Sequence, residues 1–381
     1  MTQQYLFDIN EISEHEQRRQ IDEARDVIIE YLKQNPGKRA GVYFSRGKDS
    51  LLTAVLAVEA SERLGIEPPC LFSSIVPYEV ENEKLWFNHL VDNITGVQWR
   101  AAEPAPFMAF SVKVLGIGTI PPLLHVIKWC NSAYKKMPLD TLVHECKNDF
   151  VFFTGIRADE SIRRRKRFEA QGYYIKDRNY VTPIIKVEEP SLWEYLKHNL
   201  YKIGIDYELL RLEYAQKQRG GCWFCPNACS YGDNSLTSDI IKTLRGHFYL
   251  GERNTLLPFP GDEINDGQQY VRRFAQYAIN DGVAHYRTQL CFCKQWYDEL
   301  IELQNKYQRH LLTDLHKKMI FELWNWRELI NERITQADFL STFFSGQYKA
   351  LYPELFDVVF RRVGKRYCYI RGVLKEIKPL S

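Results

Sequence analysis

The sequence predicts an α/β fold, a doubly wound parallel sheet joined to a mainly α-helical C-terminal domain. Short runs of apolar and β-branched residues alternate with segments long enough for helices, an order typical of a parallel sheet with helices on both faces. Beyond residue 230 the apolar residues recur at helical spacing over longer segments. A chain of 381 residues is long enough for two such domains.

The first expected element is an amphipathic helix in residues 11–34, where apolar positions at helical spacing lead into the turn NPGK. Strands are expected in residues 40–44, 70–76, 97–101 and 150–155. Further helices are expected in the stretches VRRFAQYAI, WYDELIELQNKYQRHLLTDLHKKMIFELWNWRELI and ADFLSTFFSGQYKALYPELF.

These elements divide the chain into three parts. An N-terminal helix occupies residues 1–36, the doubly wound domain residues 37–235, and the mainly helical domain residues 236–381. The sequence shows neither internal repeats nor low-complexity tracts.

The composition is that of a globular, soluble protein, with 45% hydrophobic, 26% charged and 14% aromatic residues. The N-terminus lacks the pattern of a signal peptide, and no apolar run approaches the roughly 18 residues needed to span a bilayer, so we expect a cytoplasmic protein without membrane contact. Nine unevenly spaced cysteines in such a chain favour a metal or catalytic role over disulfides. A net charge of +3 is too small to indicate a nucleic-acid partner by itself.

The stretch SRGKDS lies where an expected strand gives way to a helix, so backbone N–H groups and the helix dipole can converge there on an anion. Lys48 adds a positive charge, and Asp49 is a candidate ligand for the magnesium that accompanies a triphosphate. The Walker glycine spacing is absent. The alternative is a polar turn in which Ser45 or Asp49 merely caps the helix. The candidate binding residues are Ser45, Arg46, Gly47, Lys48, Asp49 and Ser50.

Arg46 is unusual in such a loop, because glycine normally stands wherever the backbone wraps a phosphate closely or adopts a positive φ. At negative φ a side chain costs little, and an arginine there would add attraction for phosphate. We therefore expect Arg46 at negative φ in a working loop, with Lys48 and Asp49 exposed in the site.

The cysteines of CWFCPNAC form a C-x2-C-x3-C array that can present three thiolates to one centre, namely Cys222, Cys225 and Cys229. A C-x2-C pair flanked by glycine and proline suits either zinc or an iron–sulfur cluster, and spacing alone leaves both open. Three further cysteines have apolar or aromatic neighbours and are expected to be small buried side chains: Cys70, Cys146 and Cys368.

Basic residues gather in three other places. Arg157 and Glu160 in GIRADES follow an expected strand, where ligands of open α/β sheets bind, and an arginine there can hold a phosphate or sulfate, or else pair with Asp159 or Glu160. The basic run at 163–167 is either a solvated helix face or a contact for a nucleic-acid backbone. The stretch FRRVGKRYCYIRG suits nucleic acid or a half-buried strand equally well.

Several motifs occur in an order found in one superfamily. After SRGKDS come KWCNSAYKKMPL, FFTGIRADESIRRRKR, VTPIIKVEEPSLWEYLKHNLYKIGIDYELL and RGGCWFCP. On these motifs, residues 35–245 resemble the phosphoadenosine phosphosulfate reductase family, whose loop is Ser-Gly-Gly-x-Asp-Ser. Within it, FMAFSVKVLGIGTIPPLLHVIKWC and GCWFCPNACSYGDNSLTSDI are similar to the DndC-type sulfurtransferases of DNA phosphorothioation.

The resemblance implies a PP-loop ATP pyrophosphatase fold and an ATP-dependent sulfurtransferase, in which the catalytic residues would be Lys48, Asp49, Arg157 and Glu160. It implies ATP, magnesium and a 4Fe-4S cluster as cofactors. The cluster ligands would match Cys130, Cys222 and Cys225, with Cys229, Cys291 or Cys293 as the fourth. The partners implied are nucleic acid, DNA rather than RNA, a sulfur donor such as a cysteine desulfurase, and other subunits of a modification complex.

The sequence departs from the family pattern at Arg46, at Lys128 in place of an arginine, at Pro226 in place of a threonine, and in NSAYKKM. One alternative is reductive cleavage of a phosphosulfate nucleotide, but the family's Glu-Cys-Gly-Leu-His tail is absent from a chain ending RGVLKEIKPLS. Another alternative is a non-catalytic nucleic-acid-binding subunit with structural zinc, for which Arg46 is the main indication.

Overall fold

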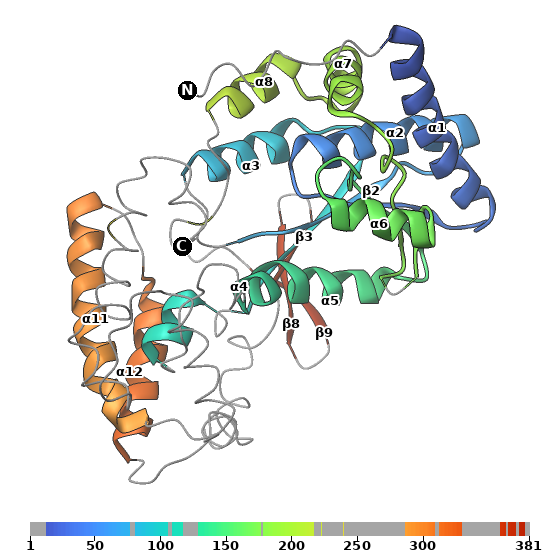
Figure 1. Cartoon of the computed structure of the whole chain (residues 1–381). Coiled ribbons are helices and arrows are strands. Elements are labelled where there is room, and N and C mark those ends of the chain that lie inside the picture. Colours follow the sequence, from blue (N-terminus) through green and yellow to red (C-terminus); the bar gives the residue numbers. More distant parts are fainter. Residues whose placement is uncertain are drawn as a thin grey trace.

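The computed structural model describes residues 13–76, 81–105, 109–116, 129–176, 178–216, 222, 239, 286–308, 312–329, 359–362, 365–370 and 373–377. The described strands form one nine-stranded sheet in the order β5-β6-β4-β1-β2-β3-β7-β8-β9. Figure 1 labels β2, β3, β8 and β9 of this sheet. The strands are β1 (Arg39–Tyr43), β2 (Cys70–Ser74), β3 (Gln98–Glu103), β4 (Phe150–Thr154), β5 (Tyr174–Ile175), β6 (Tyr180–Val181), β7 (Val359–Arg362), β8 (Lys365–Ile370) and β9 (Val373–Ile377).

Helices connect and flank these strands. The α-helices are α1 (Glu14–Lys33), α2 (Lys48–Leu64), α3 (Glu81–Asn93), α4 (Trp129–Asn131), α5 (Met137–Cys146), α6 (Ile162–Gln171), α7 (Glu189–Asn199), α8 (Tyr207–Gln216), α11 (Tyr286–Tyr307) and α12 (Asp314–Leu329). Short π- and 3-10 segments are η3 (Val112–Gly116), η4 (Ser132–Lys136) and η5 (Leu200–Ile203). The α/β class and the expected N-terminal helix and first four strands are confirmed.

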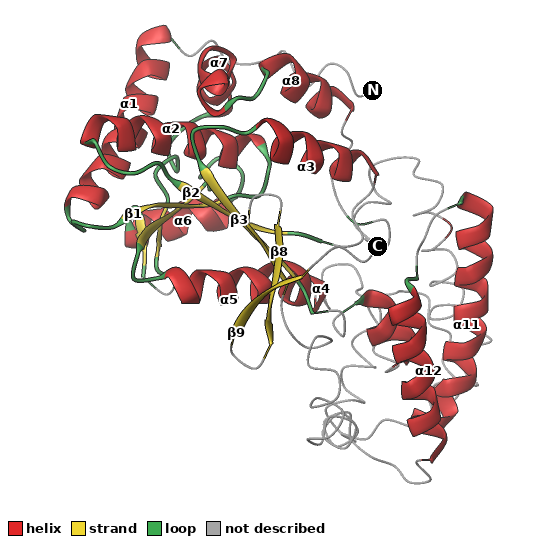
Figure 2. Cartoon of the chain, turned by 180° about the vertical axis from the view of Figure 1, so that it is seen from behind, coloured by secondary structure: helices red, strands yellow, loops and turns green. Residues whose placement is uncertain are grey.

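The sheet is mostly parallel at its centre, where β3, β2, β1, β4 and β6 run in one direction, while β5 is antiparallel to β6. Helices cover both faces, with α1, α2 and α7 on one and α5 on the other (Figure 2). Because both faces are covered, the central strands β2 and β4 are mostly apolar, and β1 is buried except at its ends. The core beneath α2 includes Val42, Leu52 and Val55, each fully buried.

The direction of the chain across the sheet reverses between β1 and β4. From β1 the strands proceed through β2 to β3, and the chain then returns to place β4 on the opposite side of β1. Gly155 directly follows β4 and lies against the start of α2, where a Cβ would be 2.6 Å from the carbonyl oxygen of Asp49. A side chain would push these two segments apart. In open α/β sheets, ligands bind at such a reversal, beyond the carboxyl ends of the strands.

The C-terminal part is only partly as predicted. Helices α11 and α12 confirm the helical expectation for WYDELIELQNKYQRHLLTDLHKKMIFELWNWRELI, and they pack on η3, where the Trp324 indole donates a hydrogen bond to the Leu115 carbonyl at 2.8 Å. The other two expected C-terminal helices lie outside the described residues. No helix in the described part of the chain is long and apolar enough to cross a membrane.

The described C-terminal residues lie mostly in α11 and α12, and three short strands, β7, β8 and β9, follow these helices in the chain. β7 pairs antiparallel with β3, and β8 and β9 continue that ladder, so these three strands extend the parallel sheet at its β3 edge. The described residues of the stretch FRRVGKRYCYIRG therefore belong to two strands, β7 and β8. Tyr367 and Tyr369 recur at every second residue of β8, and aromatic residues favour strands, but sequence alone does not reveal which sheet edge such a strand joins.

Candidate active site

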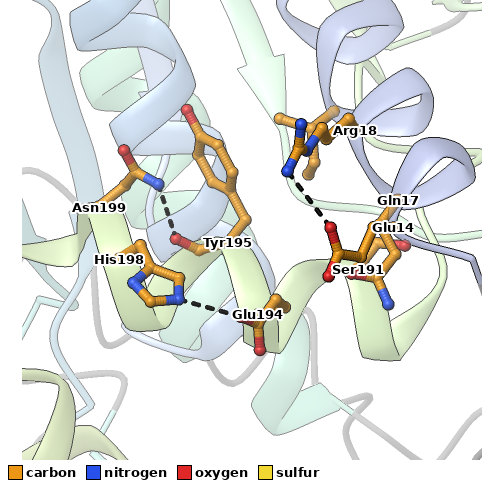
Figure 3. Close-up of a pocket in the computed structure, with 9 residues that line it drawn as sticks. Glu14, Gln17, Arg18, Ser191, Glu194, Tyr195, His198 and Asn199 are labelled. Carbon is orange, nitrogen blue, oxygen red and sulfur yellow. Dashed lines mark hydrogen bonds and ion pairs between the residues drawn. The ribbon is translucent and has the colours of Figure 1, made fainter.

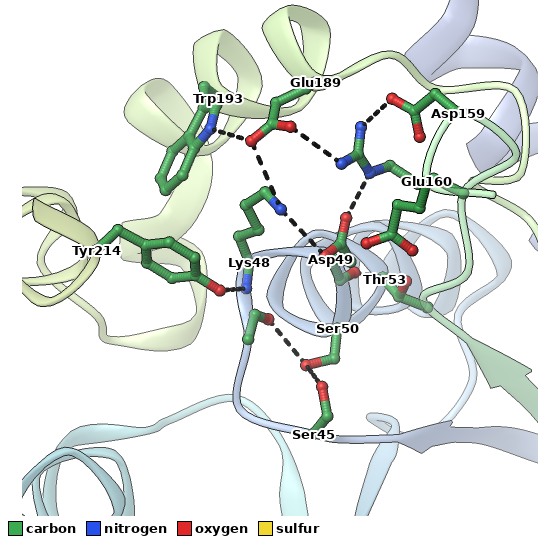
Figure 4. Close-up of polar contacts among 12 residues, drawn as sticks. Ser45, Lys48, Asp49, Ser50, Thr53, Asp159, Glu160, Glu189, Trp193 and Tyr214 are labelled. Carbon is green, nitrogen blue, oxygen red and sulfur yellow. Dashed lines mark hydrogen bonds and ion pairs between the residues drawn. The ribbon is translucent and has the colours of Figure 1, made fainter. Parts of the chain in front are cut away.

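The loop 45–50 joins the carboxyl end of β1 to the start of α2, at the reversal of the sheet. Gly47 is the N-cap residue of α2, and no side chain caps the helix from that position. The Ser50 hydroxyl donates to the Gly47 carbonyl at 2.9 Å, and the Ser45 hydroxyl lies 3.2 Å from that of Ser50 (Figure 4). The alternative in which Ser45 or Asp49 is the N-cap is therefore wrong.

Arg46 has a φ of +69°, so the expectation of a negative φ is wrong. The backbone adopts the left-handed conformation that glycine favours, which costs about 1–2 kcal/mol for another residue. The contacts of Arg46 offset this cost, since its guanidinium lies 5.3 Å from the Phe87 ring centroid and the Trp86 indole donates to its carbonyl at 3.0 Å. The side chain is buried and lies against α3. The loop thus keeps a glycine-like path although the residue is arginine.

Tyr214 of α8 contacts the start of α2. The backbone N–H of Lys48 donates a hydrogen bond to the Tyr214 hydroxyl at 2.7 Å (Figure 4). The Lys48 ammonium lies 5.8 Å from the centroid of the same ring, and the ring packs edge-on against Trp193 of α7 at 5.2 Å. An N–H at a helix N-terminus is a group that binds anions, so the Tyr214 oxygen takes a position that suits a phosphate oxygen.

Arg157 is the centre of an ion-pair network across the reversal of the sheet. It follows β4, its side chain is 1% exposed, and its Nε donates to Asp49 Oδ1 at 2.5 Å. Its other nitrogens bind Asp159 at 2.6 Å and Glu189 at 3.3 Å. Burial alone would lower the pKa of Arg157, but the carboxylates of Asp49 and Asp159 outweigh it and raise the pKa. The expected pairing with Asp159 is present, and it joins the buried Arg157 to a carboxylate whose side chain is 40% exposed.

Lys48 lies between two carboxylates. Its ammonium is 3.4 Å from Asp49 Oδ2 and 3.5 Å from Glu189 Oε1, and the Trp193 indole donates to the same Glu189 oxygen at 3.2 Å. Burial would raise the pKa of Glu189, but the charge of Lys48 and the Trp193 hydrogen bond outweigh it and lower that pKa. The side chains of Lys48 and Asp49 are only 12% and 18% exposed, so the expectation that both are exposed is wrong.

The pKa of Asp159 shifts in the opposite direction to that of Glu189. Burial raises its pKa above the ordinary value, and the charge of Arg157 only partly opposes this. The neighbouring charges of Glu189 and Asp49 raise the pKa further. Of Asp159 and Glu189, whose pKa values shift in opposite directions, Asp159 is therefore the one that binds a proton more readily.

Glu160 does not pair with Arg157. It forms an ion pair with Arg164 one turn into α6. The basic run 163–167 lies on that helix, and most of its side chains are exposed. The sequence-predicted residues Lys48, Asp49 and Arg157 thus lie together, whereas Glu160 belongs to an adjacent contact with the basic helix.

The described cysteines fall into two groups. Cys130 lies in α4, and both Cys130 and Cys222 are partly exposed. Cys70 and Cys146 are buried as expected, and burial raises the pKa of the Cys146 thiol, next to Arg100. Cys293 is fully buried on α11, with its thiol 3.6 Å from the Val114 carbonyl oxygen.

The cluster predicted for these cysteines stays a prediction. The side chains of Cys225, Cys229, Cys291 and Cys368 lie outside the described residues. Within the described ranges, no three histidine, cysteine or acidic side chains are grouped closely enough to hold a metal ion.

Sequence reasoning missed Glu189 and Tyr214 as parts of this site. Glu189 begins α7 just before Pro190, at the position where acidic residues favour a helix N-terminus, so a helix-start signal was available. Tyr214 lies in an amphipathic helix whose local pattern contains no sign of a contact 166 residues away.

No family model matches the chain. Over 195 residues the chain is 29% identical to the uncharacterized protein MJ0066 of Methanocaldococcus jannaschii, an alignment that covers 49% of this chain and 35% of that relative. The chain thus spans about a third of the length of the curated relative that it matches. This likeness carries no activity to the chain, which leaves the site geometry and the motifs as the basis for a function.

Proposed function

We propose that this protein is an ATP-dependent sulfurtransferase that binds ATP on the loop 45–50 and activates a nucleic-acid acceptor, DNA rather than RNA. One observation carries the proposal. The loop meets the segment after β4 at the reversal of a parallel sheet, and the Arg157–Asp49 ion pair joins the two segments. This is where nucleotides bind in open α/β folds, and it is where the motif order places ATP.

The chemistry follows from the charges at the loop. Attack of an acceptor oxygen on the α-phosphorus of ATP forms an adenylylated acceptor and releases pyrophosphate. A sulfur nucleophile then displaces AMP. The α2 N-terminus and the Lys48 ammonium stabilise negative charge that develops on the phosphates. Lys48 is suited to this role because its position between Asp49 and Glu189 is fixed before ATP binds.

Magnesium fits this arrangement as a companion of the nucleotide. In phosphate sites it is usually held by one or two carboxylates together with phosphate oxygens. Asp49 is placed to supply one carboxylate, and since its oxygens contact Arg157 and Lys48 in this structure, it would exchange one of these contacts for the ion. Arg157, held by three carboxylates, then orients Asp49 rather than gripping phosphate directly.

An iron–sulfur cluster is part of the proposal on the strength of the cysteine spacing and the family resemblance. Cys130 and Cys222 are partly exposed, and Cys225 and Cys229 complete the proposed set. The cluster, held by cysteine thiolates, would lie close to the place where a cysteine desulfurase delivers sulfur to the protein. Other subunits of a modification complex are the expected partners.

The test is release of pyrophosphate from ATP in the presence of single- and double-stranded oligonucleotides. Lys48→Ala and Asp49→Ala should abolish it, whereas Lys33→Ala, an exposed lysine at the end of α1, should leave it unchanged. Equal pyrophosphate release by all four proteins would refute the catalytic assignment. Tight binding of adenosine phosphosulfate without oligonucleotide binding would favour a phosphosulfate reductase instead.

A further inference from the structure

A small cavity opens beside α6, at the carboxyl ends of β4 and β6. It measures about 150 Å³. Its apolar part consists of Ile156, Ile175, Ile185 and Phe168, and its polar part of Tyr180, Thr182 and three arginines, Arg163, Arg164 and Arg167. Ile156 is followed directly by Arg157, so the cavity and the ion-pair network lie on neighbouring residues of one segment.

The charged residues that line this cavity are all positive. No carboxylate lines it, and Glu160, which pairs with Arg164, is the acidic partner nearest in sequence. By contrast, the larger cavity between α1 and α7, of about 590 Å³, is lined by the carboxylates of Glu14 and Glu194 as well as by Arg18 (Figure 3). There Arg18 contacts Glu14 at 3.3 Å and His198 contacts Glu194 at 3.0 Å. The α6 cavity is therefore the one suited to an anionic ligand.

The size and lining select the kind of ligand. A cavity of about 150 Å³ lined by aliphatic and aromatic groups accepts one aromatic ring of the size of benzene. Arginines at its edge bind phosphate oxygens and stack on flat rings. In a nucleotide with a single-ring base and a phosphate on each side, the ring can pack against the apolar wall while the phosphates bind the guanidinium groups.

We propose that this cavity binds one pyrimidine base of a single-stranded nucleic acid, with Arg163 and Arg167 on its flanking phosphates. The proposal deepens the proposed function, because it supplies the acceptor's docking position next to the nucleotide loop. It also divides the basic run 163–167 in two. Arg163, Arg164 and Arg167 line the cavity, whereas Arg165 and Lys166 are exposed residues of the same helix outside it.

This division gives a matched pair of variants for a binding experiment. Arg163→Ala/Arg167→Ala and Arg165→Ala/Lys166→Ala each remove two positive charges from α6. Binding of a fluorescent oligothymidylate is measured by anisotropy across a salt series, without ATP. The cavity pair should weaken binding about tenfold and lower the log–log salt slope by about 1.4, for two lost contacts on a single strand. The control pair should change binding by less than about twofold.

A second comparison uses the unmodified protein and tests the base itself. An abasic deoxyribose-phosphate oligomer of the same length keeps the phosphates and lacks the ring, so it should bind about tenfold more weakly than oligothymidylate. Equal losses in the two variant pairs, or equal affinity for the abasic oligomer, would overturn the cavity while leaving nucleic-acid binding intact. If the unmodified protein binds no oligonucleotide, both the cavity and the nucleic-acid acceptor of the proposed function are wrong, while pyrophosphate release still tests the loop separately.

Discussion

The hydroxyl oxygen of Tyr214 accepts a hydrogen bond of 2.7 Å from the backbone nitrogen of Lys48, the first residue of α2. A phosphate at this helix N-terminus would use the same N–H. Tyr214 and the nucleotide therefore compete for one donor, and α8 has to shift when ATP binds in the proposed way.

Tyr214→Phe removes the competing oxygen and keeps the ring against Trp193. A neutral hydrogen bond contributes about 0.5–1.5 kcal/mol, so the dissociation constant for ATP should fall by about two- to tenfold. Calorimetric titration measures the affinity. Tyr207→Phe is the matched control, because Tyr207 lies on the same helix and faces the same indole at 6.4 Å. Weaker ATP binding by Tyr214→Phe would mean that the hydroxyl supports the bound state instead.

Arg46→Gly and Arg46→Ala test the positive φ. Both lose the contact with Phe87, but only glycine also removes the left-handed strain, so Arg46→Ala should be less stable than Arg46→Gly by about 1 kcal/mol. Urea denaturation measures the difference. Equal stabilities would contradict the backbone conformation. Pyrophosphate release by Arg46→Gly should stay within about twofold of the unmodified protein, because the arginine side chain lies against α3 and not over the loop.

Glu59 joins α2 to its neighbours through a buried ion pair. Its carboxylate binds Arg25 at 2.6 Å, Tyr195 at 2.5 Å and Lys202 at 2.7 Å. Glu59→Gln leaves the buried Arg25 with only the exposed Asp22 as its charge partner, and the free energy of unfolding should fall by up to about 3–5 kcal/mol. The control is Glu14→Gln, whose exposed pair with Arg18 contributes about 0.5 kcal/mol or less. A small effect at Glu59 would show that the pair is solvated.

The same ion pair predicts a dependence on pH. Burial would raise the pKa of Glu59, but the hydrogen bonds from Lys202 and Tyr195 and the charge of Arg25 outweigh it, so the pKa lies below its ordinary 4.5. A lowered pKa adds stability that is fully present above pH 4.5 and is lost as the pH falls through the folded-state pKa. The stability difference between the unmodified protein and Glu59→Gln should therefore shrink below pH 4.5. A constant difference down to acid unfolding would contradict the lowered pKa.

The cysteines predict the metal content. Protein purified without oxygen should be brown and contain iron and acid-labile sulfide, and Cys130→Ser and Cys222→Ser should each lose the colour. Cys293→Ser should keep it, because that thiol is buried against the Val114 carbonyl beneath α11. Comparison of Cys229→Ser with Cys291→Ser identifies the fourth ligand. If the protein instead contains one equivalent of zinc and no acid-labile sulfide, the cluster assignment is wrong and the cysteines form a structural zinc site.

The parallel sheet could be predicted because its signals are local. Apolar runs such as FVFFT mark strands that are covered on both faces, and SRGKDS marks the turn between β1 and α2. The network around Arg157 could not, because Asp49 and Glu189 lie 108 and 32 residues away from it. The sequence indicates only that Arg157 and Asp49 lie after two different strands. They meet because β4 lies next to β1 in the sheet.

Arg46 shows a different limit of sequence reasoning. From the side chain alone, either Arg46 has a negative φ or the loop has lost its function. The contacts with Phe87 and Trp86, about 40 residues along the chain, permit a third solution in which an arginine adopts the glycine conformation. Local residue preferences do not contain that tertiary compensation.

The pairing of β3 with β7 ties residues 98–103 to residues 359–362. During synthesis on the ribosome, the outer edge of β3 is made long before the strand that pairs with it. An open strand edge is a template for joining another chain, and contacts between such distant segments form slowly. Nascent or truncated chains that lack β7, β8 and β9 would therefore expose the edge of β3 to pairing with other chains. The yield of soluble protein should then depend on how quickly these last strands join the sheet.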